Sequence, residues 1–296
     1  MTLTKLTGSV YVFQGPTNIG VIATPTEEAI LIDSGLDEST ARKVLRSVEQ
    51  QGLQVKAIIN THSHADHIGG NAFVQARTGA AVYASPLEAP LIRYPQLEPT
   101  MLLGGANPWK DMRNKFLMAK PSLVTEELGG GPYTVCGRQL QIISLPGHSL
   151  DQIGVLADGV LFVGDAYISS HLLQKHGIPY NVNIKDYLNT LDKLVESHCD
   201  WFVPSHGEPT ENITADIAAN RSTVLSLVEQ VASWLSEPLT AEELVAKLCT
   251  HLQVTPGNPG LFFLYRTAVM AYLSFLQEQE RVQAVINDNK LVWQRR

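Results

Sequence analysis

The order of expected secondary structure indicates an α+β fold, in which two β-sheets pack together and helices lie outside them. Short segments rich in β-branched and apolar residues come first, a helical segment intervenes, and the same order then recurs. The length of 296 residues and the hydrophobic share of 44% fit a globular protein with one large domain and a smaller appendix. These observations predict a sandwich of sheets and helices followed by a separate tail.

The first part of the chain alternates strands with turn-forming segments before its first helix. That helix is expected because apolar residues lie three and four positions apart and Gly52 ends the pattern. The expected elements are strands at 9–14, 19–23, 29–33 and 55–60 and helices at 39–51 and 70–78.

The middle of the chain repeats this order after an interruption. Residues 86–125 combine helical fragments, prolines and methionines with a Gly-Gly break, and we interpret them as an insertion. The expected elements around it are strands at 81–84, 138–144, 153–157, 160–163 and 201–204 and an amphipathic helix at 184–197.

The last segment changes character and is expected to be a winged-helix-like C-terminal domain. Its helices would be followed by a hairpin through residues 287–290. We therefore divide the chain into a catalytic domain at 1–212, which contains the insertion, and a C-terminal domain at 213–296. The expected elements of the tail are helices at 213–236, 240–249 and 261–279 and strands at 282–286 and 291–294.

Composition and charge limit where the protein is expected to be located in the cell and which classes of molecule it is expected to bind. The N-terminus lacks the apolar run of a secretory signal, and the apolar segment 261–276 contains Arg266, so we expect a cytoplasmic protein that does not span a membrane. The three cysteines are far apart and indicate reduced thiols rather than a disulfide framework. The net charge of −7 argues against a surface that binds nucleic acid throughout.

Histidines and carboxylates follow apolar strands at several places, and together they predict a metal centre. Imidazole and carboxylate are ligands of Zn²⁺ and similar ions, and loops on a rigid scaffold are where functional groups concentrate. Two alternating histidines on one tight loop can converge on one ion, while the next two residues of the run face a second. The candidate ligands are His62, His64, Asp66, His67, His148, Asp165 and His206.

These motifs, together with Asp33 in Ile32-Asp33-Ser34-Gly35, resemble the metallo-β-lactamase superfamily from near Val10 to about Glu208. The resemblance implies an αββα sandwich with two metal ions. It implies that His62, His64 and His148 hold one ion, that Asp66, His67 and His206 hold the other, and that Asp165 bridges them. Asp33 would orient ligands by hydrogen bonding. Zinc is expected, although the ligand types do not exclude iron or manganese.

The resemblance also implies a reaction, in which a metal-bridging hydroxide attacks a small ester, thioester or lactone. Asp66 could also accept or pass a proton. Tyr167, two residues after Asp165, could donate to a substrate oxyanion, or its ring could pack against the sheet. Asp165 stands where antibiotic-hydrolysing members carry Cys, and His64 where the diiron flavoproteins carry Glu, so neither of those branches is expected.

Two other reactions remain open. A winged-helix-like tail also occurs in endoribonucleases of this superfamily, where the metal pair cleaves a phosphodiester. From Asp216 onward, however, the chain has seven basic and eight acidic residues, which favours a small acyl substrate over nucleic acid. Iron-dependent persulfide dioxygenases are a third alternative, but they use a subset of these ligands.

The insertion at 86–125 has two interpretations. Its apolar residues could pack on the protein's own core or on a partner subunit, and it is compatible with a homodimer. It could instead be a lid that supplies an apolar pocket for an acyl chain. The residues at helical spacing are Trp109, Met112, Phe116 and Leu117.

Overall fold

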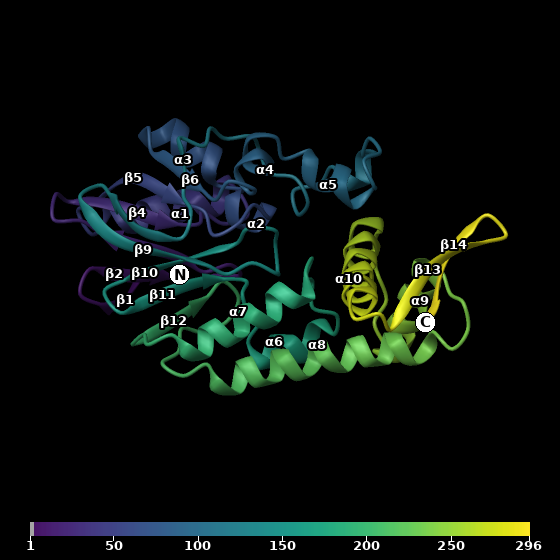
Figure 1. Ribbon diagram of the computed structural model, residues 1–296. Coiled ribbons are helices and arrows are strands. Elements are labelled where there is room, and N and C mark those ends of the chain that lie inside the picture. Colours follow the sequence, from purple (N-terminus) through teal and green to yellow (C-terminus); the bar gives the residue numbers. More distant parts are fainter. Residues whose placement is uncertain (1–2) are drawn as a thin grey trace.

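Two β-sheets lie face to face in the computed structural model of the protein, and helices cover the outer face of each (Figure 1). The structure describes residues 3–296, except for the side chains of residues 174–176. The strands of the first sheet follow chain order, and they are β1 (Leu3–Thr7), β2 (Val10–Phe13), β3 (Ile19–Ala23), β4 (Glu28–Ile32), β5 (Gln54–Ile59), β6 (Ala81–Ala84) and β7 (Glu126–Glu127). The second sheet has the order β12-β11-β10-β9-β8, and its strands are β8 (Gly131–Val135), β9 (Arg138–Ser144), β10 (Ile153–Ala157), β11 (Val160–Gly164) and β12 (Trp201–Pro204). The predicted αββα sandwich is confirmed.

The alternation of side chains along the strands divides the core into layers. Ile30 and Ile32 of β4 and Ile59 of β5 belong to the cluster between the two sheets. Leu31 and Ile58 point the other way and pack with the outer helices. Successive residues of a strand face opposite sides, so a strand covered on both faces is apolar throughout.

The helices begin and end close to where the sequence predicts. Helix α1 (Glu38–Glu49) is capped by Asp37, whose side chain accepts a hydrogen bond from the Thr40 amide. Its buried residues are the four that define the apolar stripe: Ala41, Val44, Leu45 and Val48. With α2 (Ala65–Ile68) and α3 (Asn71–Thr78) it lies on the first-sheet side, while α6 (Ser170–His176), α7 (Ile184–Glu196) and α8 (Thr214–Trp234) lie on the other (Figure 1). Strands β1, β7 and β8 and helices α2 and α6 were not expected from the sequence.

The C-terminal segment is helical and ends in a hairpin, as expected. It contains α8, α9 (Ala241–His251), α10 (Pro259–Glu278), β13 (Val282–Asn287) and β14 (Lys290–Arg295). Leu191 of α7, Val228 of α8 and Tyr272 of α10 belong to one continuous cluster of buried side chains. The tail therefore shares its core with the sandwich, while the winged-helix likeness and the boundary at 212/213 stay predictions.

The insertion packs on the C-terminal segment. It contains α4 (Ala89–Arg93), α5 (Leu97–Leu102) and a single 3₁₀ turn, η1 (Lys110–Met112). Met112 and Leu117 are buried against Phe263 and Leu264 of α10. The expected apolar stripe is therefore only half realised, because Trp109 and Phe116 remain 44% and 67% exposed.

Helix α10 is long and apolar enough to cross a membrane by length and composition alone. In the structure it packs against α5, α7, α8 and α9. Its Arg266 donates to Glu242 of α9, at 2.8 Å between Nε and Oε1. This packing accounts for the apolar composition of the helix, and the expectation of no membrane contact stays a prediction.

Candidate metal centre

The site is assembled at the carboxyl ends of strands in both sheets. Strands β4 and β5 are parallel, as are β11 and β12, so the residues that follow each pair emerge side by side. The loops after β4, β5, β9, β11 and β12 carry, in that order, Asp33, the His62–His67 run, His148, Asp165 and His206. The centre therefore depends on the two sheets being packed together.

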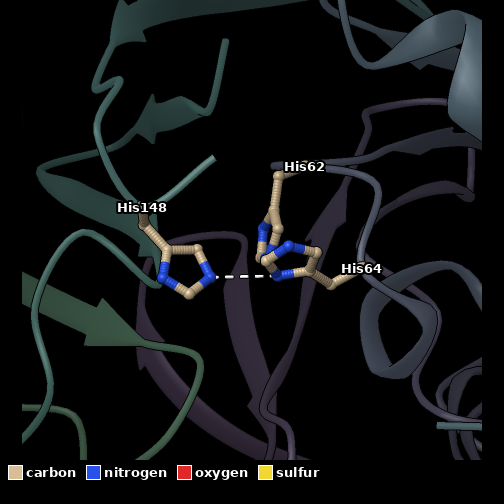
Figure 2. Close-up of side chains that lie close together, drawn as sticks. All are labelled: His62, His64 and His148. Carbon is tan, nitrogen blue, oxygen red and sulfur yellow. Dashed lines mark hydrogen bonds between the residues drawn. The ribbon is translucent and has the colours of Figure 1, made fainter. Parts of the chain in front are cut away.

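Three histidines form the first group, as Figure 2 shows. His64 Nδ1 lies 3.0 Å from His62 Nε2 and 3.0 Å from His148 Nε2. A single shared proton could not satisfy three ring nitrogens that face one another. A cation that takes a lone pair from each nitrogen satisfies all three.

The second group is Asp66, His67 and His206, and Asp165 lies between the two groups. His206 Nε2 is 3.2 Å from Asp66 Oδ2 and 3.5 Å from Asp165 Oδ2. Asp165 Oδ2 is also 3.4 Å from His148 Nε2, which belongs to the first group. The structure thus brings all seven predicted ligands together, with Asp165 in the central position expected of a bridging residue.

Hydrogen bonds on the outer side fix the rings of His62 and His67. His67 Nδ1 donates to Asp33 Oδ2 at 2.8 Å. The Thr61 hydroxyl also donates to Asp33 Oδ2, so it accepts from His62 Nδ1 at 3.1 Å. In both rings Nδ1 carries a proton and Nε2 points inward, which is the usual arrangement of a metal-binding imidazole.

Backbone carbonyls fix two more rings in the same way. His148 Nδ1 donates to the Tyr180 carbonyl at 2.9 Å, and His206 Nδ1 donates to the Pro16 carbonyl at 2.7 Å. His64 differs, because its Nδ1 points inward and its Nε2 has no hydrogen-bond partner among the residues that the structure describes.

The inward atoms fit metal ions better than they fit one another. His67 Nε2 and Asp165 Oδ1 are buried with no hydrogen-bond partner in the described part of the chain. Buried polar atoms are normally satisfied, and each orphan of this kind calls for an explanation. Coordination to a divalent ion supplies one for both atoms.

The electrostatics agree with this interpretation. The charge of Asp165 raises the pKa of His206 to about 11, although burial opposes the shift. Burial likewise lowers the pKa of His67, but Asp66, Asp165 and Asp33 outweigh it and the pKa is raised well above its ordinary value. The raised pKa values favour the protonated form of both rings in the metal-free protein, so the carboxylates at these positions attract positive charge, as they do in a metal site.

Asp33 is held in a conformation that few residues adopt. Its φ is +64°, in the left-handed region that Asp and Asn tolerate better than most residues. It is 1% exposed and accepts from the Thr61 amide, the Thr61 hydroxyl and His67, each at 2.8 Å. Its position fits the predicted role of orienting a ligand.

Tyr167 agrees with the second of its two expected roles, in which the ring packs in the core, and not with the role of a donor to substrate. Its ring is 1% exposed and belongs to the core that includes α7 and α8. Burial, together with the charge of Asp216, raises the pKa of its hydroxyl. The side chain therefore lies in the core near α8 and does not line the metal centre.

A cavity of about 550 Å³ opens beside the metal centre. Three predicted ligands line it, and α10 contributes a wall. Its lining is Pro16, His148, Asp165, Ile168, Leu172, Ile178, Tyr180, His206, Leu261, Leu264, Tyr265 and Ala268. A second space of about 200 Å³, the small cavity, lies on the His64 side between the insertion and Tyr180.

Glu88, a buried carboxylate beside the small cavity, was not expected from the sequence. It accepts hydrogen bonds from the loops that carry His64 and His148. A lone glutamate has no informative spacing. The available signal was a charge inside the otherwise apolar segment from Leu87 to Ile92.

A protein-family model and several curated proteins match the sequence of this chain. The family model described as "Metallo-beta-lactamase superfamily" matches residues 12–206. A linear primary-alkylsulfatase from Pseudomonas sp. is 26% identical over 81% of this chain and 52% of its own length. A hydroxyacylglutathione hydrolase from Vibrio cholerae is 26% identical over 54% of this chain and 50% of its own. An atrochrysone carboxyl ACP thioesterase from Passalora fulva is 23% identical over 80% of this chain and 64% of its own. The chain thus spans about half the length of the first two of these relatives.

Solved structures share the fold over nearly the whole chain. A metallo-beta-lactamase family protein from Thermus thermophilus has a TM-score of 0.75 at 23% identity, and the match covers 97% of this chain and 99% of that protein. A beta-lactamase domain protein from Burkholderia ambifaria also has a TM-score of 0.75, at 18% identity, over 99% of this chain and 93% of its own. At such identities the likeness concerns the fold, which here includes the C-terminal segment.

Proposed function

This chain belongs to the metallo-beta-lactamase superfamily, and we propose that it is a hydrolase that binds two zinc ions and cleaves a small ester, thioester or lactone. The observation that carries the substrate class is the cavity of about 550 Å³ beside the metal centre, which joins the centre to an apolar space and is from here on called the acyl cavity. Its volume of about 550 Å³ lies within the range of small-molecule sites. The apolar lining comes from Ile168, Leu172, Ile178, Leu261, Leu264 and Ala268.

The seven candidate ligands would form two metal sites with one shared residue. His62, His64 and His148 would hold one ion, Asp66, His67 and His206 the other, and Asp165 would contact both. When bound, such ions lower the pKa of water and stabilise negative charge that develops on a substrate oxygen. We also propose that Asp66 accepts or passes a proton, and its Oδ2 accepts a hydrogen bond from Thr17 Oγ1 at 3.1 Å.

The acyl cavity would orient the substrate. An acyl chain directed toward α10 would bury its methylenes against Leu261 and Leu264, each methylene contributing about 0.8 kcal/mol. The carbonyl end then lies beside His148 and His206 at the other side of the cavity. The relatives named for hydroxyacylglutathione hydrolysis and ACP thioester cleavage support this class.

A phosphodiester substrate is less well supported. Among the described residues that line the acyl cavity, none is Lys or Arg. In the hairpin region, Arg281 pairs with Glu229 at 2.6 Å and Arg296 pairs with Glu280 at 3.3 Å, which reduces the charge available to phosphates. The acidic partners weaken the case for RNA beyond what the residue count predicts.

A panel of substrates tests the proposal. Purified protein would be assayed with an acyl thioester, a lactone, an alkyl sulfate, glutathione persulfide with oxygen, and single-stranded RNA. We expect hydrolysis of the thioester or the lactone, and loss of both bound metal and activity when His62 and His64 are replaced together by Ala. Salt-sensitive RNA cleavage without acyl hydrolysis would overturn the proposed substrate class, as would oxygen consumption with the persulfide.

We also propose that the protein is cytoplasmic and that it forms a homodimer. The insertion would form the interface between the two subunits. Several large apolar side chains are exposed there: Leu87, Tyr94, Met101, Trp109, Phe116 and Leu123. Exposed apolar side chains gathered in one segment favour an interface. Sedimentation of the wild type and of Phe116→Ser tests this, because a monomeric wild type would contradict the proposal.

A further inference from the structure

Glu88 is a buried carboxylate that the proposed reaction does not use. It is 2% exposed and lies at the start of the insertion, immediately before α4. A carboxylate is seldom so completely buried without partners that compensate its charge. Its partners therefore indicate what it does.

Those partners come from two loops that are far apart in the sequence. Glu88 Oε2 accepts from the Ser63 amide at 3.0 Å and from the Ser63 hydroxyl. Glu88 Oε1 accepts from Ser149 Oγ at 2.7 Å and from the Asp151 amide at 3.0 Å. A carboxylate offers about four lone-pair sites, and here four donors use them.

Each loop carries a candidate ligand of the same ion. Ser63 lies between His62 and His64, and Ser149 directly follows His148. The two rings meet with 3.0 Å between His64 Nδ1 and His148 Nε2. Glu88 thus joins the two loops directly behind the point where their histidines converge.

His64 depends on this support more than the other candidate histidine ligands do. The rings of His62, His67, His148 and His206 each have a partner on the outer nitrogen. His64 has none among the described residues, so its placement relies on its backbone, which Glu88 holds through the neighbouring Ser63 amide.

We propose that Glu88 is a positioning residue, which sets the separation of His64 and His148 and thereby the affinity of the three-histidine group for its ion. This rests on the proposed metal-binding function. Outer partners of metal ligands typically change affinity by about 10- to 100-fold when they are removed. Glu88 acts on two ligands, and in the described part of the chain it has no hydrogen bond to the Asp66, His67 and His206 group.

Glu88→Gln is the informative substitution. The amide keeps the shape but replaces one acceptor oxygen by an NH₂ group, which would face two donors. We expect the ion of the three-histidine group to bind about 10- to 100-fold more weakly, with the other ion retained. At free zinc about tenfold above the wild-type Kd, the variant would then hold roughly 1.1 to 1.5 equivalents instead of about two.

Metal content and chelator competition, measured on the full chain without substrate, give the readout. Glu98→Gln is the matched control, because Glu98 lines the same small cavity but makes no side-chain hydrogen bond among the described residues. It should retain two equivalents. Ser149→Ala removes one of the four bonds and should give an intermediate affinity, which keeps the test available if Glu88→Gln does not fold.

Two results would overturn the proposal. One is wild-type affinity for both ions in Glu88→Gln and Ser149→Ala. The other is equal weakening of both ions together with a lower melting temperature of the metal-free protein, which would show general structural support. A wild type that binds two ions but hydrolyses no acyl substrate would refute the proposed function and leave this inference intact.

Discussion

Replacement of Asp33 by Asn tests how the centre is oriented. The backbone of Asp33 is left-handed, at φ +64°, and Asn tolerates this conformation as well as Asp does. The substitution therefore changes the hydrogen bonding of the side chain without adding backbone strain, which Asp33→Ala would do. It also preserves the volume of a side chain that is only 1% exposed.

The expected magnitude follows from the lost bond. Asp33 Oδ2 accepts from His67 Nδ1 and from the Thr61 hydroxyl, both at 2.8 Å. An NH₂ group at that position cannot accept from His67 Nδ1, and a ring that moves its proton to Nε2 loses the inward lone pair. A hydrogen bond to a charged partner contributes about 1.5–3 kcal/mol. Since about 1.4 kcal/mol corresponds to tenfold, the ion held by His67 should bind roughly 10- to 100-fold more weakly.

Chelator competition with zinc measures this change directly. Asp288→Asn is the control, because it makes the same substitution on a left-handed backbone, at φ +47°, in the exposed hairpin turn. The control should match the wild type. If Asp33→Asn bound both ions as tightly as the wild type, the idea that Asp33 orients His67 would be refuted.

Three further predictions concern the cavity, the protons and the fold. Leu261→Trp should fill part of the acyl cavity, because Leu261 lines it and is only partly buried. It should lower kcat/KM for an octanoyl ester at least about tenfold relative to an acetyl ester, since several methylenes at about 0.8 kcal/mol each lose their contacts. Equal losses for both esters would contradict the proposed acyl site. The raised pKa values of His67 and His206 (about 11 for His206) mean that both rings are protonated in the metal-free protein at pH 7. Zinc binding should therefore release about two protons, and the affinity for zinc should rise with pH. Calorimetry in buffers of different ionisation enthalpy measures the number of protons released. A result of no release would contradict the prediction. Thr240→Ala removes the capping box that Thr240 forms with Glu243 at the start of α9. The free energy of unfolding measured by urea titration should fall by about 1 kcal/mol. An unchanged urea midpoint would contradict this prediction.

The candidate ligands could be predicted from the sequence because their chemistry and their position coincide. Each group of ligands follows an apolar strand, and the ends of parallel strands meet at one edge of a sheet. The same reasoning left Tyr167 with two possible roles, because the direction of a side chain beyond a strand end depends on the loop. This loop turns Tyr167 into the core that includes α7 and α8.

Other features depend on contacts that no local pattern contains. Glu88 joins loops 25 and 61 residues away, and a single glutamate gives no periodic signal. The stripe from Trp109 to Leu117 has helical spacing, yet the chain forms one 3₁₀ turn there, since Met112 and Leu117 alone among the four find buried positions on α10. Tertiary packing decided both cases.

The central claim is that two metal ions held by these seven residues are required for acyl hydrolysis. The most direct measurement removes metal from the purified protein with a chelator and then follows thioester or lactone hydrolysis against added zinc. We predict no hydrolysis without metal, and recovery that saturates at two equivalents per chain. Full hydrolysis by the metal-free protein, or no gain on adding zinc, would contradict the claim.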